Sequence, residues 1–252
     1  MNAPLLRHGG VGVAVTVPAL LALSVLGLTA PAWGDGLTSV NGSVHVEGSS
    51  PVGDVSTVNG SIDVDPHEQA GAVHAVNGSI HIGADASVGP VSTVNGRVTV
   101  DAHAAAASLG TVNGAIELGA GAHIAGAVTT VNGHLTLADG VDIAGNLSNV
   151  NGGMRLAAVH VAGSVKTHSG DIYVGAGARI DGGIGVYRPR HDFDDWLGWI
   201  GWFGDPHQRV PRIVIAPGAV VAGTLHFERP VDLKVSREAK IGRVEGATVV
   251  SF

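Results

Sequence analysis

The feature that most constrains this chain is the dipeptide Asn-Gly, which recurs at an almost fixed spacing. The steps between successive copies are 18, 18, 18, 18, 19 and 19, and a degenerate eighth copy follows as Thr-His-Ser-Gly-Asp-Ile from Thr167. A repeat of fixed period is typical of architectures in which each unit packs only on its neighbours. The seven asparagines are Asn41, Asn59, Asn77, Asn95, Asn113, Asn132 and Asn151.

Each Asn-Gly pair opens a short segment in which apolar and polar residues alternate. The third and fifth residues after the asparagine are apolar in every unit, as with Ile80 and Ile82, and most residues between and before them are polar. A period of two places one set of side chains on a buried face and the other in water, as in a β-strand. A second pattern, typified by residues 122–128, adds one or two short strands per unit, joined by Gly turns.

One such unit cannot bury its own apolar face, whereas a stack of units buries a continuous core. We therefore predict an all-β fold, a parallel β-helix or β-solenoid with about 18 residues per turn. A meander of β-hairpins is the alternative, because Asn-Gly is also a strong hairpin signal, but a meander requires no identical residues at a fixed step. The crossover rule favours right-handed coiling, and a left-handed hexapeptide coil stays open.

Stacked turns of such a solenoid lie ~4.8 Å apart, which would set each asparagine over the next. We expect an internal asparagine ladder whose side-chain amides hydrogen-bond to one another, as in cross-β stacks. The glycine after each asparagine is expected to accept a positive φ at the corner.

Composition agrees with this fold and narrows the function. Hydrophobic residues make up 45% of the 252 residues and aromatic residues only 4%, so Val, Ile, Leu and Ala must fill the core. The formal charge is -7 with no basic stripe, which disfavours nucleic acid as a partner. The chain has no cysteine, which excludes disulfides, thiolate metal sites and a cysteine nucleophile.

Residues 1–32 are predicted to form an export signal. Arg7 precedes an apolar run from Val11 to Ala30, and Ala30-Pro31-Ala32 supplies the small residues that signal peptidases require. An uncleaved membrane anchor is the alternative, because the run is long enough to span a bilayer. In either case we expect the rest of the chain to be exported, to the periplasm or the cell surface.

An aromatic insertion interrupts the repeat at residues 187–212. We predict solenoid turns over 33–186 and again over 213–252, where Ile213/Ile215 and Val231/Leu233 restart the 18-residue step. The insertion is interpreted as a plug on the solenoid, a contact surface for a membrane or protein partner, or a stacking surface for sugar. The predicted contact residues are Phe193, Trp196, Trp199, Trp202 and Phe203.

Two groups of repeat proteins resemble this chain over residues 37–186 and 211–250. The segment Thr167–Val174 and the Val-Asn-Gly copies resemble the repeats of bacterial adhesin-type β-solenoid proteins. The segment Gly218–Leu225, Gly-Ala-Val-Val-Ala-Gly-Thr-Leu, resembles bactofilins, which are polymer-forming β-helices. The resemblance implies the architecture. Bactofilins are cytoplasmic and have no cleavable signal, so this chain departs from them over residues 1–32.

Histidine is enriched, with 13 copies, and some copies fall at equivalent outward positions. His45, Asp63 and His81 share one column, and His67 and His103 share another. Such columns offer metal-binding side chains, but the pattern fixes no third ligand. We therefore interpret them as solvated ladders and predict neither a metal site nor a cofactor.

Most outward positions carry Ser, Thr, Ala or Gly, and no nucleophile elbow, phosphate loop or triad is present. We predict no catalytic residues and a non-enzymatic envelope scaffold or adhesin-like protein. The chain finishes on the apolar residues Val249-Val250-Ser251-Phe252, so we expect end-to-end self-association. An envelope protein, a membrane surface or a polysaccharide is the expected partner. The alternative is a carbohydrate-binding or carbohydrate-cleaving β-helix, which needs acids and bases gathered on one outer face.

Overall fold

A computed structural model describes residues 34–48, 50–187 and 210–252. All of these residues belong to one compact unit, Ala32–Phe252. The predicted export signal over residues 1–32 lies outside them. So do the predicted contact residues Phe193, Trp196, Trp199, Trp202 and Phe203.

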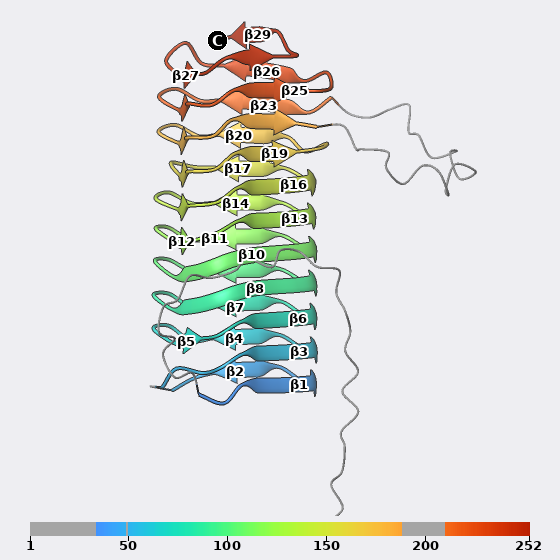
Figure 1. Ribbon diagram of the computed structural model, residues 1–252, viewed down its shortest axis with the longest axis vertical. Helices are drawn as coiled ribbons and strands as arrows, with labels where there is room; N and C mark the ends of the chain where they lie inside the picture. Colours follow the sequence, from blue (N-terminus) through green and yellow to red (C-terminus); the bar gives the residue numbers. More distant parts are fainter. Residues whose placement is uncertain (1–33, 49, 188–209) are drawn as a thin grey trace, which may run out of the picture. The chain divides into compact units, whose positions relative to one another are not determined.

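This unit contains a parallel β-solenoid whose turns stack one upon the next (Figure 1). One sheet holds 11 strands, one from each turn, so the stack extends about 48 Å at ~4.8 Å per turn. Strands of neighbouring turns pair in parallel, as Ile80 does with Val98. The prediction of a parallel β-helix is therefore confirmed, and the hairpin meander is excluded because it would pair its strands antiparallel.

Three walls enclose the core of each turn. Wall 1 is the 11-stranded sheet. Its strands are β2 (Val44–Val46), β4 (Ile62–Val64), β7 (Ile80–Ile82), β9 (Val98–Val100), β11 (Ile116–Leu118), β14 (Leu135–Leu137), β17 (Met154–Leu156), β20 (Ile172–Val174), β23 (Arg212–Ile215), β26 (Asp232–Val235) and β29 (Val249–Ser251).

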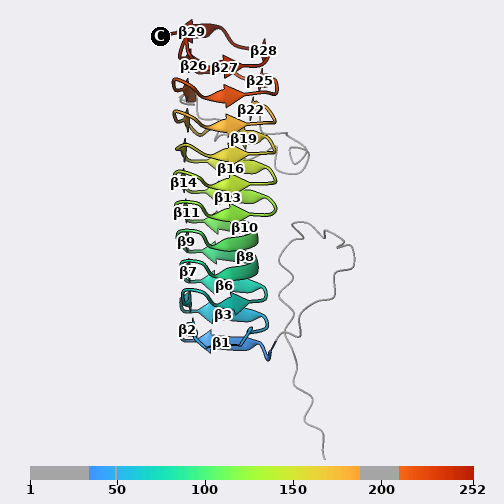
Figure 2. The same cartoon turned by 90° about the vertical axis from the view of Figure 1, so that its left-hand side faces the viewer.

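Walls 2 and 3 belong to one 18-stranded sheet that bends at a corner. The long strand β8 (Ser87–Asn95) contributes to both walls, because its first residues pair with β5 and its last residues pair with β6. The strand β10 (Ala105–Asn113) continues the same path one turn later. Figure 2 shows the strands of wall 3 above one another.

The remaining strands divide between these two walls. Wall 2 also contains β5 (Gln69–Ala70), β12 (His123–Ile124), β15 (Asp142–Ile143), β18 (His160–Val161), β21 (Arg179–Ile180), β24 (Val220–Val221) and β27 (Lys240–Ile241). Wall 3 also contains β1 (Leu37–Asn41), β3 (Val55–Asn59), β6 (Val73–Asn77), β13 (Val128–Asn132), β16 (Leu147–Asn151), β19 (Val165–Thr167), β22 (Ile184–Val186), β25 (Leu225–Phe227) and β28 (Val244–Glu245).

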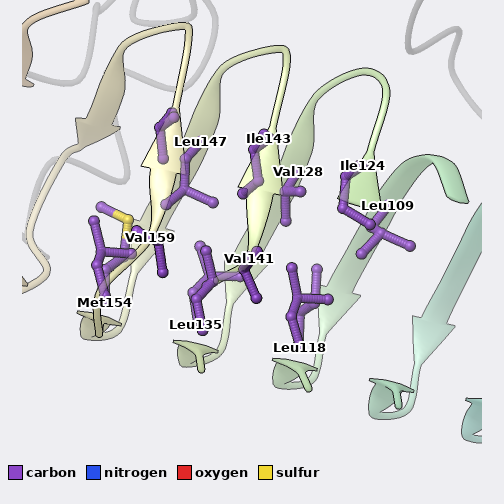
Figure 3. Close-up of a cluster of buried hydrophobic side chains, with 14 of the residues drawn as sticks. Leu109, Leu118, Ile124, Val128, Leu135, Val141, Ile143, Leu147, Met154 and Val159 are labelled. Carbon is purple, nitrogen blue, oxygen red and sulfur yellow. The ribbon is translucent and has the colours of Figure 1, made fainter. Parts of the chain in front are cut away.

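The core consists of apolar columns that run along the stack. On wall 1, the inward residue Ile80 lies between Ile62 and Val98 of the neighbouring turns, and all three are fully buried. Figure 3 shows Leu135 pointing inward from wall 1 and Ile143 from wall 2. Branched aliphatic side chains suit these columns because they pack closely on a pleated surface.

The step between turns changes after the insertion. Ile213 pairs with Leu233 rather than with Val231, and Leu233 pairs in turn with Val249. The expected 18-residue step from Ile213 to Val231 is therefore wrong. The step from Ile213 to Leu233 is longer than the regular step of the repeat, and the step from Leu233 to Val249 is shorter. The corner that contains Arg229 takes up the difference, and its Nη1 donates a 2.9 Å hydrogen bond to the carbonyl oxygen of His168. Corners can change length because only the strands must keep their pairing.

Candidate functional site

The seven asparagines form one column at the corner between wall 3 and wall 1. Nδ2 of each asparagine after Asn41 donates to Oδ1 of the asparagine one turn earlier, with N–O distances of 2.8 to 3.0 Å. Ser169 takes the next position, and its Oγ donates a 2.6 Å hydrogen bond to Oδ1 of Asn151. The column therefore links eight successive turns through side chains alone.

This asparagine column is exposed to solvent, so the expectation of an internal ladder is wrong. Alternation alone would bury Asn59, which has the same parity along β3 as the buried residues Val55 and Thr57. The chain turns at Gly60, and the asparagine side chain lies on the outer side of that corner. Period-two reasoning holds only while the strand continues.

A threonine column two residues earlier provides the internal polar ladder instead. Thr130 is fully buried, and its Oγ1 donates to the carbonyl oxygen of Gly114 over 3.2 Å. Thr57, Thr93 and Thr111 make the same contact with a glycine carbonyl, at 2.9 to 3.3 Å. The hydroxyl groups thus satisfy carbonyls that the corner turns away from the ladder of backbone hydrogen bonds.

The glycine after each asparagine is required by crowding at most corners. φ is in the positive range at Gly42, Gly60 and Gly152, with values of 154°, 153° and 129°, but not at the four corners between them. The expectation of a positive φ at every corner is therefore wrong. A Cβ atom on Gly96 would collide with the carbonyl oxygen of Gly78 one turn earlier. Glycine permits the close approach of stacked corners.

A different column of turn residues does need the left-handed backbone. His67, Asp85 and His103 have φ values of 65°, 60° and 59°. The two histidines predicted to share an outward column therefore lie in equivalent turns, with Asp85 between them. His67 Nδ1 lies 4.0 Å from Asp85 Oδ2. Glycine takes the corresponding role in later turns, as at Gly121 with a φ of 68°.

The predicted column of His45, Asp63 and His81 forms on the outer face of wall 1. His81 is held between two carboxylates, since Nδ1 lies 2.9 Å from Asp63 Oδ1 and Nε2 lies 3.0 Å from Asp101 Oδ2. Burial lowers the pKa of His81, but its hydrogen bonds to Asp101 and Asp63 outweigh burial, so the pKa is raised overall. Sequence reasoning missed Asp65 and Asp101, which follow their strands at the corner.

A second row of histidine and aspartate side chains, which we call the charge chain, crosses wall 2. His160 Nδ1 lies 2.6 Å from Asp142 Oδ1, and His160 Nε2 lies 2.9 Å from Asp181 Oδ2. His123 contacts Asp142 from the preceding turn at 2.9 Å, and Arg179 contacts Asp181 at 2.7 Å. His123, Asp142 and His160 follow one another at the repeat period. The repeat period alone could therefore have predicted this part of the charge chain.

Hydrogen bonds to Asp181 and Asp142 raise the pKa of His160. The hydrogen bond from His160 is the main cause that lowers the pKa of Asp181, and the charge of Arg179 adds to it. Both ring nitrogens of His160 face carboxylates, and only the imidazolium form can donate to both. The charge chain is therefore an arrangement of ion pairs whose strength depends on pH.

A shallow open groove crosses the outer face of wall 1 farther along the stack. Its walls include Arg97, Glu117, His134, Arg155 and Tyr173. The Arg97 guanidinium lies 3.2 Å from the Glu117 carboxylate, and Tyr173 is 45% exposed. This combination of an exposed aromatic ring with charged hydrogen-bonding groups is suited to a polar ligand.

No protein-family model matches the chain, and no curated protein or solved structure shows significant similarity to it. In the part of the chain that the structure describes, no helix is long and apolar enough to cross a membrane.

Proposed function

We propose that this chain is an exported, non-enzymatic β-solenoid that serves as a scaffold or adhesin-like protein of the cell envelope and associates end to end. Opposite charge at the two ends of the stack carries the proposal. Residues 34–101 contain eight acidic side chains and one basic side chain, whereas residues 210–252 contain six basic and four acidic side chains. Complementary charges of this kind favour and orient head-to-tail encounter.

The strands at the two ends of the stack also support end-to-end association. Among the described residues, β1 pairs only with β3, and β29 pairs only with β26. Val249 continues an inward column of wall 1 and is 37% exposed, whereas Leu233 below it is 1% exposed. Val44 of a second copy would extend this column, bury Val249 and pair with the edge of β29 that no described strand occupies.

Sedimentation velocity of the protein purified from cells that export it tests the proposal. We expect the average mass to rise with protein concentration and to fall with added salt, which screens charges at the ends. Val249→Asp should abolish association, whereas Val250→Asp, at the neighbouring outward position, should preserve it. A constant monomer mass up to high micromolar concentration would contradict self-association.

Placement in the envelope rests on the signal predicted over residues 1–32. Phe193, Trp196, Trp199, Trp202 and Phe203 are the proposed contact residues for an envelope protein or a membrane surface. Cell fractionation of the intact chain, and of a chain that lacks residues 190–207, tests both points. We expect an exported protein in each case and weaker envelope association after the deletion.

The groove on wall 1 favours a second candidate function, the binding of an envelope polysaccharide. Tyr173 offers a ring for stacking on a sugar, and Arg97, Glu117 and Arg155 offer groups that hydrogen-bond to hydroxyls. Binding of cell-wall glycans, measured with Tyr173→Ala as the variant and Tyr187→Ala as the control, distinguishes this function from scaffolding.

A further inference from the structure

His45 faces three carboxylates on wall 1 and forms no hydrogen bond to them. Nε2 lies 3.4 Å from Asp65 Oδ2 and 3.8 Å from Glu47 Oε2, and Nδ1 lies 3.9 Å from Asp63 Oδ2. His81 differs, because carboxylates lie within 3.0 Å of both of its ring nitrogens. The two histidines thus share one column but have different environments.

The 3.4 Å between His45 Nε2 and Asp65 Oδ2 is the separation of two ligands on one metal ion, and Glu47 Oε2 lies a little farther away at 3.8 Å. Tetrahedral ligands at 2.0–2.2 Å from zinc are separated from one another by about 3.4 Å. Ligand atoms of His45, Glu47 and Asp65 all lie within 4.8 Å of one another. The carboxylates of Glu47 and Asp65 would close onto one ion by rotation of their side chains.

We propose that His45, Glu47 and Asp65 bind a divalent transition-metal ion of the zinc class. One imidazole nitrogen with two carboxylate oxygens suits Zn²⁺, because imidazole disfavours Ca²⁺ and Mg²⁺ and no soft thiolate is present. The three ligands leave a further position open to water. The site rests on these residues alone and is independent of the proposed envelope function.

The surroundings of the three ligands favour a cation. Arg97 is the only lysine or arginine between residues 34 and 101, so the carboxylates have few competing cationic side chains. Asp63 Oδ2 lies 3.9 Å from Nδ1 of His45, opposite the ligand nitrogen, and a hydrogen bond formed there on metal binding would orient the ring. Asp63 is held in turn by His81 at 2.9 Å.

The ion would join two turns of the solenoid. His45 and Glu47 belong to the turn of β2, whereas Asp65 follows β4 in the next turn. Binding to the folded state alone would stabilise this end of the stack. Because the side chains of His45 and Asp65 are 49% and 40% exposed, the ion should exchange freely with solvent and yield to chelators.

Isothermal titration of the untagged, exported protein with ZnCl2 tests the proposal. We expect one Zn²⁺ per chain and a rise in melting temperature that EDTA reverses. His45→Ala and Asp65→Asn should each weaken binding at least tenfold, with circular dichroism unchanged because these side chains are exposed. Co²⁺ should give the intense visible absorption of a four-coordinate site, and His45→Ala should abolish it.

Two control variants separate this site from general histidine binding. His74→Ala removes an outward histidine on wall 3 that pairs with Ser92, and His123→Ala removes one that pairs with Asp142 on wall 2. Both should bind Zn²⁺ as the parent protein does. Absence of binding, equal binding by His45→Ala, or equal loss in the control variants would overturn the assignment.

Discussion

Asn95 donates a 2.8 Å hydrogen bond from Nδ2 to Oδ1 of Asn77, one turn earlier in the stack. The same bond joins each neighbouring pair of the asparagine column, and every member is exposed to solvent. These amides therefore hold the corners of successive turns in register without being part of the core. Their regular spacing in the sequence reflects a surface ladder.

Asn95→Asp removes the donor of this bond and sets a carboxylate oxygen against Oδ1 of Asn77. We expect the free energy of unfolding to fall by about 1 kcal/mol, since a single exposed hydrogen bond is lost and water screens the charge. Urea denaturation at neutral pH measures the change. Asn146→Asp is the control, because Asn146 uses Oδ1 to accept from the backbone NH of Ser164, and aspartate keeps that acceptor. Equal losses in both variants would show that the Nδ2 bond is not the cause.

Thr130→Val tests the internal threonine column. Valine preserves the shape of the side chain but leaves the carbonyl oxygen of Gly114 without its hydroxyl donor. We expect a loss of about 1 kcal/mol in the free energy of unfolding. The adjacent Thr129 points outward, so Thr129→Val should change stability by much less. An unchanged denaturation midpoint for Thr130→Val would mean that packing alone holds this column.

Gly96→Ala tests the crowding of stacked corners. The added Cβ would meet the backbone of Gly78, which cannot move without breaking the pairing of both turns. We expect a loss of about 2 kcal/mol or more, as for an overpacked core. Gly110 lies in β10 with no atom within 4 Å of a built Cβ, so Gly110→Ala should be tolerated. Thermal denaturation compares the two variants, and similar melting temperatures would refute the crowding.

The charge chain on wall 2 predicts a dependence of stability on pH. The raised pKa of His160 adds stability that is fully present below its ordinary pKa of 6.5 and is lost as the pH rises through the higher folded value. The lowered pKa of Asp181 adds stability that is fully present above the ordinary pKa of 3.8 and is lost as the pH falls through the lower folded value. Both contributions to stability are therefore fully present between pH 3.8 and pH 6.5.

His160→Gln should reduce the melting temperature more at about pH 5.5 than at about pH 8.5. His74→Gln is the matched control, because His74 pairs with the hydroxyl of Ser92 and should show no such difference. A loss of equal size at both pH values in His160→Gln would indicate that the ring acts through packing rather than charge.

The fold could be predicted from the sequence because its determinants are periodic. A nearly fixed step between Asn-Gly copies, with apolar residues at the third and fifth positions after each asparagine, admits few structures besides a stack of parallel strands. The shared column of His45, Asp63 and His81 follows from that step alone. The same reasoning failed after the insertion, where corner lengths vary and Leu233 rather than Val231 takes the place over Ile213.

Corners and contacts between turns were decided only by the tertiary structure. Alternation along a strand predicts which side chains are buried, but a corner rotates the chain, and Asn59 is consequently exposed whereas Thr57 is buried. The approach of Asp65 to His45 depends on both the distance between turns and the path of the chain after β4. The sequence alone therefore determined the stack and its core, because these follow from local periodicity. The three-dimensional path of the corners determined which polar side chains meet, because those meetings join residues from different turns.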